Sequence, residues 1–183
     1  MVRKLGGNPI ELWVVAEVID KNGKILEKRR WKSKSWTVNM ITVIWAHFAN
    51  VESSVIDINA QSRTMSRSTI ERANAGAGDD SFGIVVGSGT PSPWSLGSKI
   101  PHGTAANHLQ YEAVTISGIS NNQFDIARNF VNLSGGDIIV TECGLYVNHA
   151  DLYPTAFILD EISPPITVPD QATLRIVYTI KTV

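Results

Sequence analysis

The closing stretch of the chain, residues 164–183 (PPITVPDQATLRIVYTIKTV), alternates between apolar and polar side chains. The apolar positions of one face are Leu174, Ile176, Tyr178 and Ile180. The intervening positions are polar except for Val177. A period of two residues is that of a strand with one buried face, whereas an α-helix repeats every 3.6 residues. This stretch therefore predicts a half-buried β-strand.

The preceding residues continue the pattern, with short apolar runs broken by Gly, Ser, Asn and Pro. A short apolar strand is predicted in FGIVVGSG, from residue 82, and others at 108–117, 123–132, 137–147, 155–160 and 171–181. Short strands at such spacings are typical of a sandwich or barrel. The prolines at 164, 165 and 169 place that segment on a sheet edge or in a polyproline-like link.

The N-terminal part predicts a hairpin of strands 9–20 and 24–34, joined at Asn22-Gly23. Residues 36–49 change to a helical stripe of apolar side chains, with Ser35 or Thr37 as a possible cap. Residues 51–72 predict one or two short strands. We therefore expect an all-β fold, an antiparallel, jelly-roll-like β-sandwich with one packed α-helix. It forms a single domain over 1–183, with hairpin and helix in 1–50 and the sandwich core in 51–183.

Charge argues against some classes of function. The net charge is −1 and charged residues make up 18% of the chain, so we expect no nucleic-acid partner. Residues 1–34 hold nine Lys/Arg and four Asp/Glu, so the remainder is acidic. The basic part could dock head to tail onto other copies or onto an acidic partner, or it could be a solvated hairpin.

No motif indicates a catalytic, cofactor or metal site. Cys143 is the single cysteine, so no intramolecular disulfide can form, and we expect it to be a small buried residue. His102 and His108 flank a loop and could approach each other, although loop packing explains them equally. We find no signal peptide and no apolar run of membrane-spanning length, and therefore expect a soluble cytosolic product without a membrane partner.

Two features are candidate interfaces. The cations at alternate positions of the second predicted strand share one face: Lys28, Arg30, Lys32 and Lys34. They could dock on an acidic surface, or protect a sheet edge from unwanted strand pairing.

The second feature is the long irregular segment 88–107, which carries Trp94 and Leu96. Both must pack on the body or on a neighbour. Trp94 is the candidate anchor of an interface, because buried aromatic residues contribute much of an interface's energy. The alternative is a lid on its own sandwich.

Three segments carry a resemblance to a known family: 82–103 (FGIVVGSGTPSPWSLGSKIPHG), 129–147 (NFVNLSGGDIIVTECGLYV) and 157–180 (FILDEISPPITVPDQATLRIVYTI). Over residues 82–181 the chain resembles the structural β-domain proteins of tailed bacteriophages and related archaeal viruses. The resemblance implies a non-enzymatic virion protein, made in the host cytoplasm. It would be a capsid decoration protein that stabilises the shell by binding the major capsid protein as a homo-oligomer, with a trimer favoured. A tail or fibre-associated component is the alternative within the same class.

A function of another class is carbohydrate binding for host attachment. It would require exposed aromatic residues flanked by Asp or Asn in one groove. Trp13, Trp31 and Trp36 are the candidates.

Overall fold

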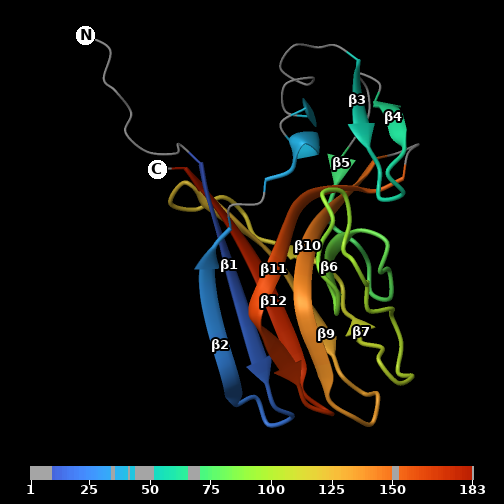
Figure 1. The fold of residues 1–183 in the computed structure, drawn as a ribbon. Helices are drawn as coiled ribbons and strands as arrows, with labels where there is room; N and C mark the ends of the chain where they lie inside the picture. The colour runs from blue at the N-terminus through green and yellow to red at the C-terminus, as the bar shows by residue number, and fades with distance from the viewer. Residues whose placement is uncertain are drawn as a thin grey trace.

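The computed structural model describes residues 10–33, 36–40, 42–43, 52–65, 71–149 and 153–182. It confirms the predicted all-β class, with antiparallel strands arranged as a sandwich (Figure 1).

The first sheet runs in the order β2-β1-β12-β9-β7, with β8 also paired to β9. Its strands are β1 (Ile10–Ile19), β2 (Ile25–Lys32), β7 (Gln110–Tyr111), β8 (Thr115–Ile116), β9 (Gln123–Val131) and β12 (Thr173–Thr182). Strand β1 pairs with β12 from Ile10↔Thr182 to Ile19↔Thr173. The N-terminal hairpin is therefore an integral part of the sandwich, and the core does not begin at residue 51.

The second sheet is built on β10, which pairs with β11 on one side and with β6 and β5 on the other. The strands are β5 (Glu71–Arg72), β6 (Gly83–Gly87), β10 (Ile138–His149) and β11 (Thr155–Val168). In β11, residues 162–165 bulge out between the pairs Glu142↔Glu161 and Val140↔Ile166, and they include a cis Ser163–Pro164 bond. Pro164 and Pro165 thus lie on an edge strand, as one of the two predictions had it, and Pro169 follows the end of that strand.

A third, two-stranded sheet of β3 (Ser53–Ile56) and β4 (Ser62–Met65) lies at one end of the sandwich (Figure 1). The side chain of Asn39 holds it by bonding both the N–H and the C=O of Ile56. Together with β5, they give three short strands in 51–72, one more than the one or two predicted.

The core lies between the two large sheets, and the alternation in β12 is confirmed. Leu174, Ile176 and Tyr178 are fully buried. Val177 points to the other face, yet only 8% of it is exposed, because Val15 on β1 and Ala127 on β9 pair beside it. The apolar residue in the polar series thus belongs to a central strand whose partners on that face, Val15 and Ala127, are also apolar.

The strand predicted at 108–117 is interrupted, giving β7 and β8. Between them the Val114 N–H donates to Ala75 O, and the Gly78 N–H donates to Tyr111 O. The chain there bonds to the 73–78 segment as well as to β9. This competing segment is distant in the sequence, so the local pattern could not reveal it and predicted one continuous strand.

The helix predicted at 36–49 begins later than expected. Residues 38–40 and 42–43 are helical, and the rest of the prediction, like Ser35, lies outside the described residues. Trp36 forms a β-bridge with Ile158, and the Thr37 N–H donates to Phe157 O. The edge of β11 therefore holds the first two positions in an extended form, which suits the β-branched Thr37.

Candidate functional site

The long loop, residues 88–107, is held on the outer face of the second sheet by a buried carboxylate. Glu142 on β10 is 0% exposed. Its Oε1 accepts the N–H groups of Gly89 at 3.0 Å and Ser98 at 2.8 Å, and its Oε2 accepts that of Gly97 at 2.8 Å. A charged acceptor with three backbone donors fixes both arms of the loop.

Tyr146 lies further along β10 and adds a fourth hydrogen bond to the long loop. Its hydroxyl accepts the Leu96 N–H at 2.6 Å. Gly87 is required beneath the loop, because a Cβ there would lie 2.3 Å from Glu142 Oε1 and 2.6 Å from Ser98 O. The loop therefore packs directly against the sheet, with no room for a side chain at Gly87.

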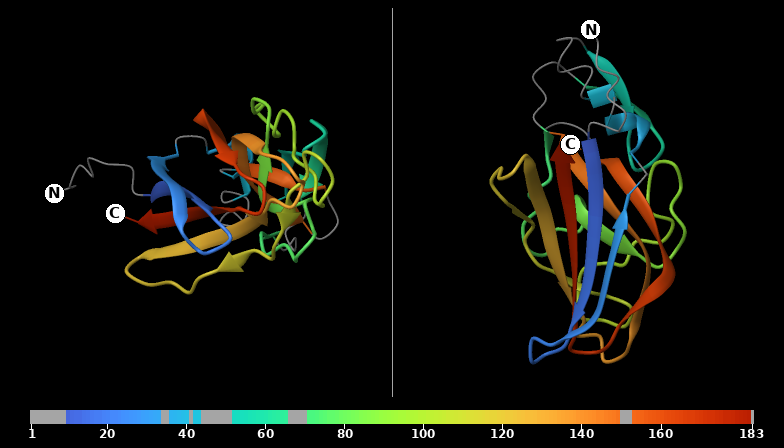
Figure 2. Two further views of the ribbon diagram at one scale, coloured as in Figure 1. Left: turned by 90° about the horizontal axis from the view of Figure 1, so that it is seen from below. Right: turned by 90° about the vertical axis from the view of Figure 1, so that its left-hand side faces the viewer.

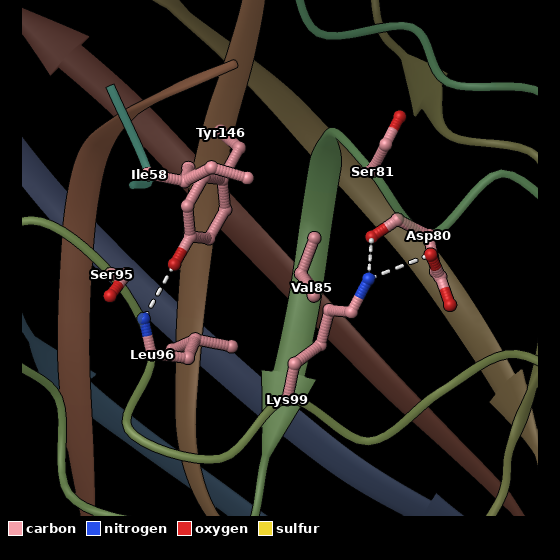
Figure 3. Close-up of a pocket in the computed structure, with 8 residues that line it drawn as sticks. All are labelled: Ile58, Asp80, Ser81, Val85, Ser95, Leu96, Lys99 and Tyr146. Atoms are coloured by element: carbon pink, nitrogen blue, oxygen red, sulfur yellow. Dashed lines mark hydrogen bonds and ion pairs between the residues drawn. The ribbon is translucent and has the colours of Figure 1, made fainter. Parts of the chain in front are cut away.

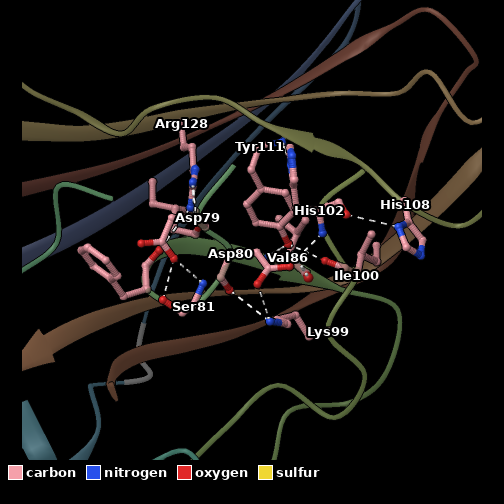
Figure 4. Close-up of polar contacts among 12 residues, drawn as sticks. Asp79, Asp80, Ser81, Val86, Lys99, Ile100, His102, His108, Tyr111 and Arg128 are labelled. Atoms are coloured by element: carbon pink, nitrogen blue, oxygen red, sulfur yellow. Dashed lines mark hydrogen bonds and ion pairs between the residues drawn. The ribbon is translucent and has the colours of Figure 1, made fainter. Parts of the chain in front are cut away.

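A buried arginine supports the opposite side of the same region. Arg128 on β9 is fully buried and its guanidinium lies over the Tyr111 ring, 4.7 Å from the centroid. It donates to five carbonyl oxygens, those of Gly76, Asp79, Phe82, Ile84 and Glu112. Burial lowers the pKa of Arg128. Its bonds tie the segment 76–84 to the first sheet (Figure 4).

Asp80 links this segment to the end of the long loop. Its Oδ1 lies 2.8 Å from Lys99 Nζ and its Oδ2 accepts the His102 N–H at 2.8 Å (Figure 4). Burial raises the pKa of Asp80, but the bonds from Lys99 and His102 outweigh it and hold the pKa below its usual value. The carboxylate therefore stays ionised and bonded.

The two histidines do lie near each other, but they have packing roles. His102 Nδ1 accepts the Tyr111 N–H at 3.1 Å, and His108 Nδ1 lies 3.2 Å from His102 O. In the part of the chain that the structure describes, no group of three or more His, Cys, Asp or Glu side chains could hold a metal ion.

Trp94 lines a surface groove of about 570 Å³, which we call the tryptophan groove. Its walls are Trp36, Thr37, Val38, Pro91, Ser92, Pro93, Trp94, Leu159 and Glu161. The Ser92 hydroxyl accepts the N–H groups of Trp94 at 3.3 Å and Ser95 at 3.0 Å, which sets a tight turn at the loop tip. Trp94 is half-buried. Partial burial fits the lid and the anchor alternatives equally, and the interface role of Trp94 stays a prediction.

A second hollow of about 200 Å³ lies beside the same loop (Figure 3). Val85, Leu96 and Tyr146 line it, with the Asp80–Lys99 pair at its edge. Leu96 is buried and belongs to the main core. Packing on the body of its own chain thus accounts for Leu96, which leaves Trp94 as the interface candidate of this loop.

The row of cations on β2 has partners within the chain. Lys28 pairs with Glu17 at 2.7 Å, and Lys32 pairs with Glu11. The guanidinium of Arg30 lies 4.3 Å from the Trp13 ring centroid. The hydrogen bond from Lys28 is the main cause of a lowered pKa for Glu17.

Because of these pairs, the surface around β2 carries negative as well as positive side chains and is not purely cationic. Lys34, the fourth member of the row, lies outside the described residues. Docking of the row on an acidic partner stays a prediction.

The three tryptophans proposed for sugar binding do not share a groove. Trp13 pairs with Lys32, whereas Trp31 pairs with Val14 in the next position, so the two rings point to opposite faces. Trp36 instead joins Trp94 in the tryptophan groove.

Cys143 is buried, as predicted, with its Sγ 3.2 Å from the Tyr178 hydroxyl. Burial raises the pKa of both groups. The thiol is therefore protonated and enclosed, which suits a packing role.

Sequence reasoning missed the two charged residues that organise the region, although each left a signal. Glu142 interrupts the apolar run IIVTECGLYV. Arg128 falls on the buried face of β9, between Ile126 and Phe130. A charge at a core position indicates a buried polar network, because an unpaired charge there would be too costly.

Comparison with known proteins found no matching family model, curated protein or solved structure. Among the described residues, no helix has both the length and the apolar character needed to cross a membrane.

Proposed function

We propose that the chain is a non-enzymatic structural protein of a tailed-virus particle. In this proposal it is a capsid decoration protein that stabilises the shell by binding the major capsid protein on its outer surface. It works as a homo-oligomer, with a trimer expected. The observation that carries the proposal is the long loop, which is fixed at both arms and presents Trp94 at its tip.

Several residues within the three resembling segments support this proposal, because their side chains hold the surface loops in place. Glu142 and Tyr146 hold the long loop, and His102 joins it to β7. Asn132 is fully buried and donates to Gly136 O and Val168 O, both at 2.8 Å, which fixes the β9–β10 turn. A scaffold of this kind keeps its surface loops in one geometry.

A fixed loop suits permanent attachment to a repeating surface. Ordering a mobile loop on binding costs free energy, and a pre-organised loop avoids that cost. A half-buried tryptophan beside two prolines, Pro91 and Pro93, offers a rigid apolar contact. A tail or fibre-associated role would use the same surface and is the alternative within this class.

The copy number of the chain in purified particles tests the proposal. Quantitative mass spectrometry would compare it with the major shell protein. A ratio near parity supports decoration of the shell, and a few copies per particle support the tail alternative. Complete absence from purified particles would refute both.

A carbohydrate-binding function is the second candidate, and the tryptophan groove favours it. Trp36 and Trp94 line one groove together with Glu161 and Ser92, which supply polar groups beside the rings. A glycan array tests this function. Binding that is lost in Trp94→Ala and kept in Trp13→Ala would support it, whereas the absence of any bound glycan would exclude it.

A further inference from the structure

We propose that two copies of the chain pair through the free edge of β8, forming a continuous sheet across a two-fold axis. The edge comprises residues 115–120, in the hairpin that joins β8 to β9 (gold in Figure 2). Figure 2 shows this hairpin projecting from one side of the first sheet.

The hairpin is well formed and its outer edge is apolar. Asn121 and Asn122 both have positive φ, 50° and 59°, which is the conformation of a tight hairpin turn. Ile119 is 83% exposed and Ile116 is 47% exposed. Ile116 ends β8 and Ile119 lies in the hairpin loop beyond it, so the hairpin presents two apolar side chains to solvent.

Among the residues that the structure describes, no backbone hydrogen bond is made on the outer side of this edge. The Ser117 N–H donates to Asp125 O on β9. Hydrogen bonding alternates along an antiparallel strand, so the N–H and C=O groups of Ile116 and Gly118 point away from β9. Residues 115–120 are all exposed, so this edge is open to solvent. A further strand can therefore approach.

The other long edges of the sandwich are protected. Strand β6 is covered by the long loop, since the Ile100 N–H donates to Val86 O. Strand β11 carries the proline bulge and is bridged by Trp36 at Ile158. Strand β2 bears the alternating cations. Charges, prolines and covering loops are the devices by which proteins prevent edge pairing.

The β8 edge has none of these devices in its sequence. Residues 113–124 (AVTISGISNNQF) contain no Asp, Glu, Lys, Arg or Pro. A strand that meets a second copy of itself antiparallel places like residues near each other, and like charges there would repel. An uncharged edge avoids this repulsion. The favoured occupant is therefore the same edge of a second copy.

A contact of this kind is isologous and closes at two subunits. It would lie between neighbouring trimers rather than within one, and only that placement rests on the proposed function. The pairing itself can be measured on the purified chain, independently of any particle.

Sedimentation of the full chain over a concentration series tests the pairing. We expect a reversible equilibrium in which the sedimenting species doubles in mass. Ile119→Lys removes two apolar contacts per dimer and sets two ammonium groups across the axis, so its dissociation constant should rise at least about tenfold. The matched control is Ile139→Lys, since Ile139 is 55% exposed on β10, and it should leave the constant unchanged. A monomeric chain up to its solubility limit, or equal effects of the two variants, would overturn the proposal.

Single cysteines keep the test decisive if the lysine variant fails to fold. Cys143 is buried, so a cysteine introduced at each of residues 115–119 reports alone. Mild oxidation should link two copies at the position nearest the axis and not at Ile139→Cys, because disulfides need close Cα atoms. Linking at none of the five positions, or equally at Ile139→Cys, would contradict edge pairing.

Discussion

Replacing Glu142 with glutamine should loosen the long loop while keeping the shape of the side chain. Oε1 serves two donors, the N–H groups of Gly89 and Ser98, and Oε2 serves that of Gly97. The less disruptive orientation of the amide places its oxygen at the Oε1 position. Its NH₂ group then faces the Gly97 N–H, so two donors meet at the site of a 2.8 Å hydrogen bond.

The expected loss of stability follows from these three bonds. Leaving one buried donor without an acceptor costs about 1–3 kcal/mol, and each of the other two bonds loses about 0.5–1 kcal/mol when its acceptor becomes neutral. The free energy of unfolding should therefore fall by about 2–5 kcal/mol. For a chain of this size each kcal/mol lowers Tm by about 2–4 °C.

Urea unfolding measures the free energy, and hydrogen exchange locates the change. Amide protection should drop at Gly89, Gly97 and Ser98 and remain in β12. The matched control is Glu161→Gln, because Glu161 is the register partner of Glu142 on β11 but is exposed. We expect the control to stay within about 0.5 kcal/mol of the natural chain. A similarly small effect of Glu142→Gln, with unchanged loop protection, would refute the anchoring role.

Three further predictions concern the surface and its support. Trp94→Ala should weaken assembly and change the melting of the isolated chain little, because the side chain is half-buried; a large loss of monomer stability would place it in the core. Asp80→Asn should destabilise the chain by about 1–3 kcal/mol at neutral pH. Because the folded pKa of Asp80 lies below its usual 3.8, its stabilisation exists above that value and is lost as pH falls through the folded pKa. The difference in urea midpoint should thus narrow in acid, and a difference that is constant with pH would contradict this account. If Lys28, Arg30 and Lys32 dock on an acidic partner, binding should weaken steeply with salt, and salt-independent binding would exclude that role.

The sequence predicted those parts of the fold whose signal is local. Alternation located β12, and Asn22-Gly23 located the first hairpin. The prediction failed where distant backbone competes with local preference. Trp36 and Thr37 are extended because the edge of β11 binds them, and this partner lies far along the chain.

The candidate site was predicted in part for the same reason. The sequence singled out Trp94 and the long loop. It could not pair Trp94 with Trp36, because no local period connects two residues that meet only after the sheets have formed. The ligands of Glu142 and Arg128 are backbone groups, which any residue supplies, so their partners leave no mark in the sequence.

In the long loop, the residues that bind Glu142 differ from those that we propose to contact a partner. Gly89 and Gly97 are bound to Glu142, and the tip between them carries Pro91, Pro93 and Trp94. Substitutions at the tip change the contact surface without breaking a buried bond, whereas substitutions at the anchors change the loop's position. In the proposed role the tip selects the partner, so comparing Trp94→Ala with Glu142→Gln in a binding assay separates recognition from support of the loop.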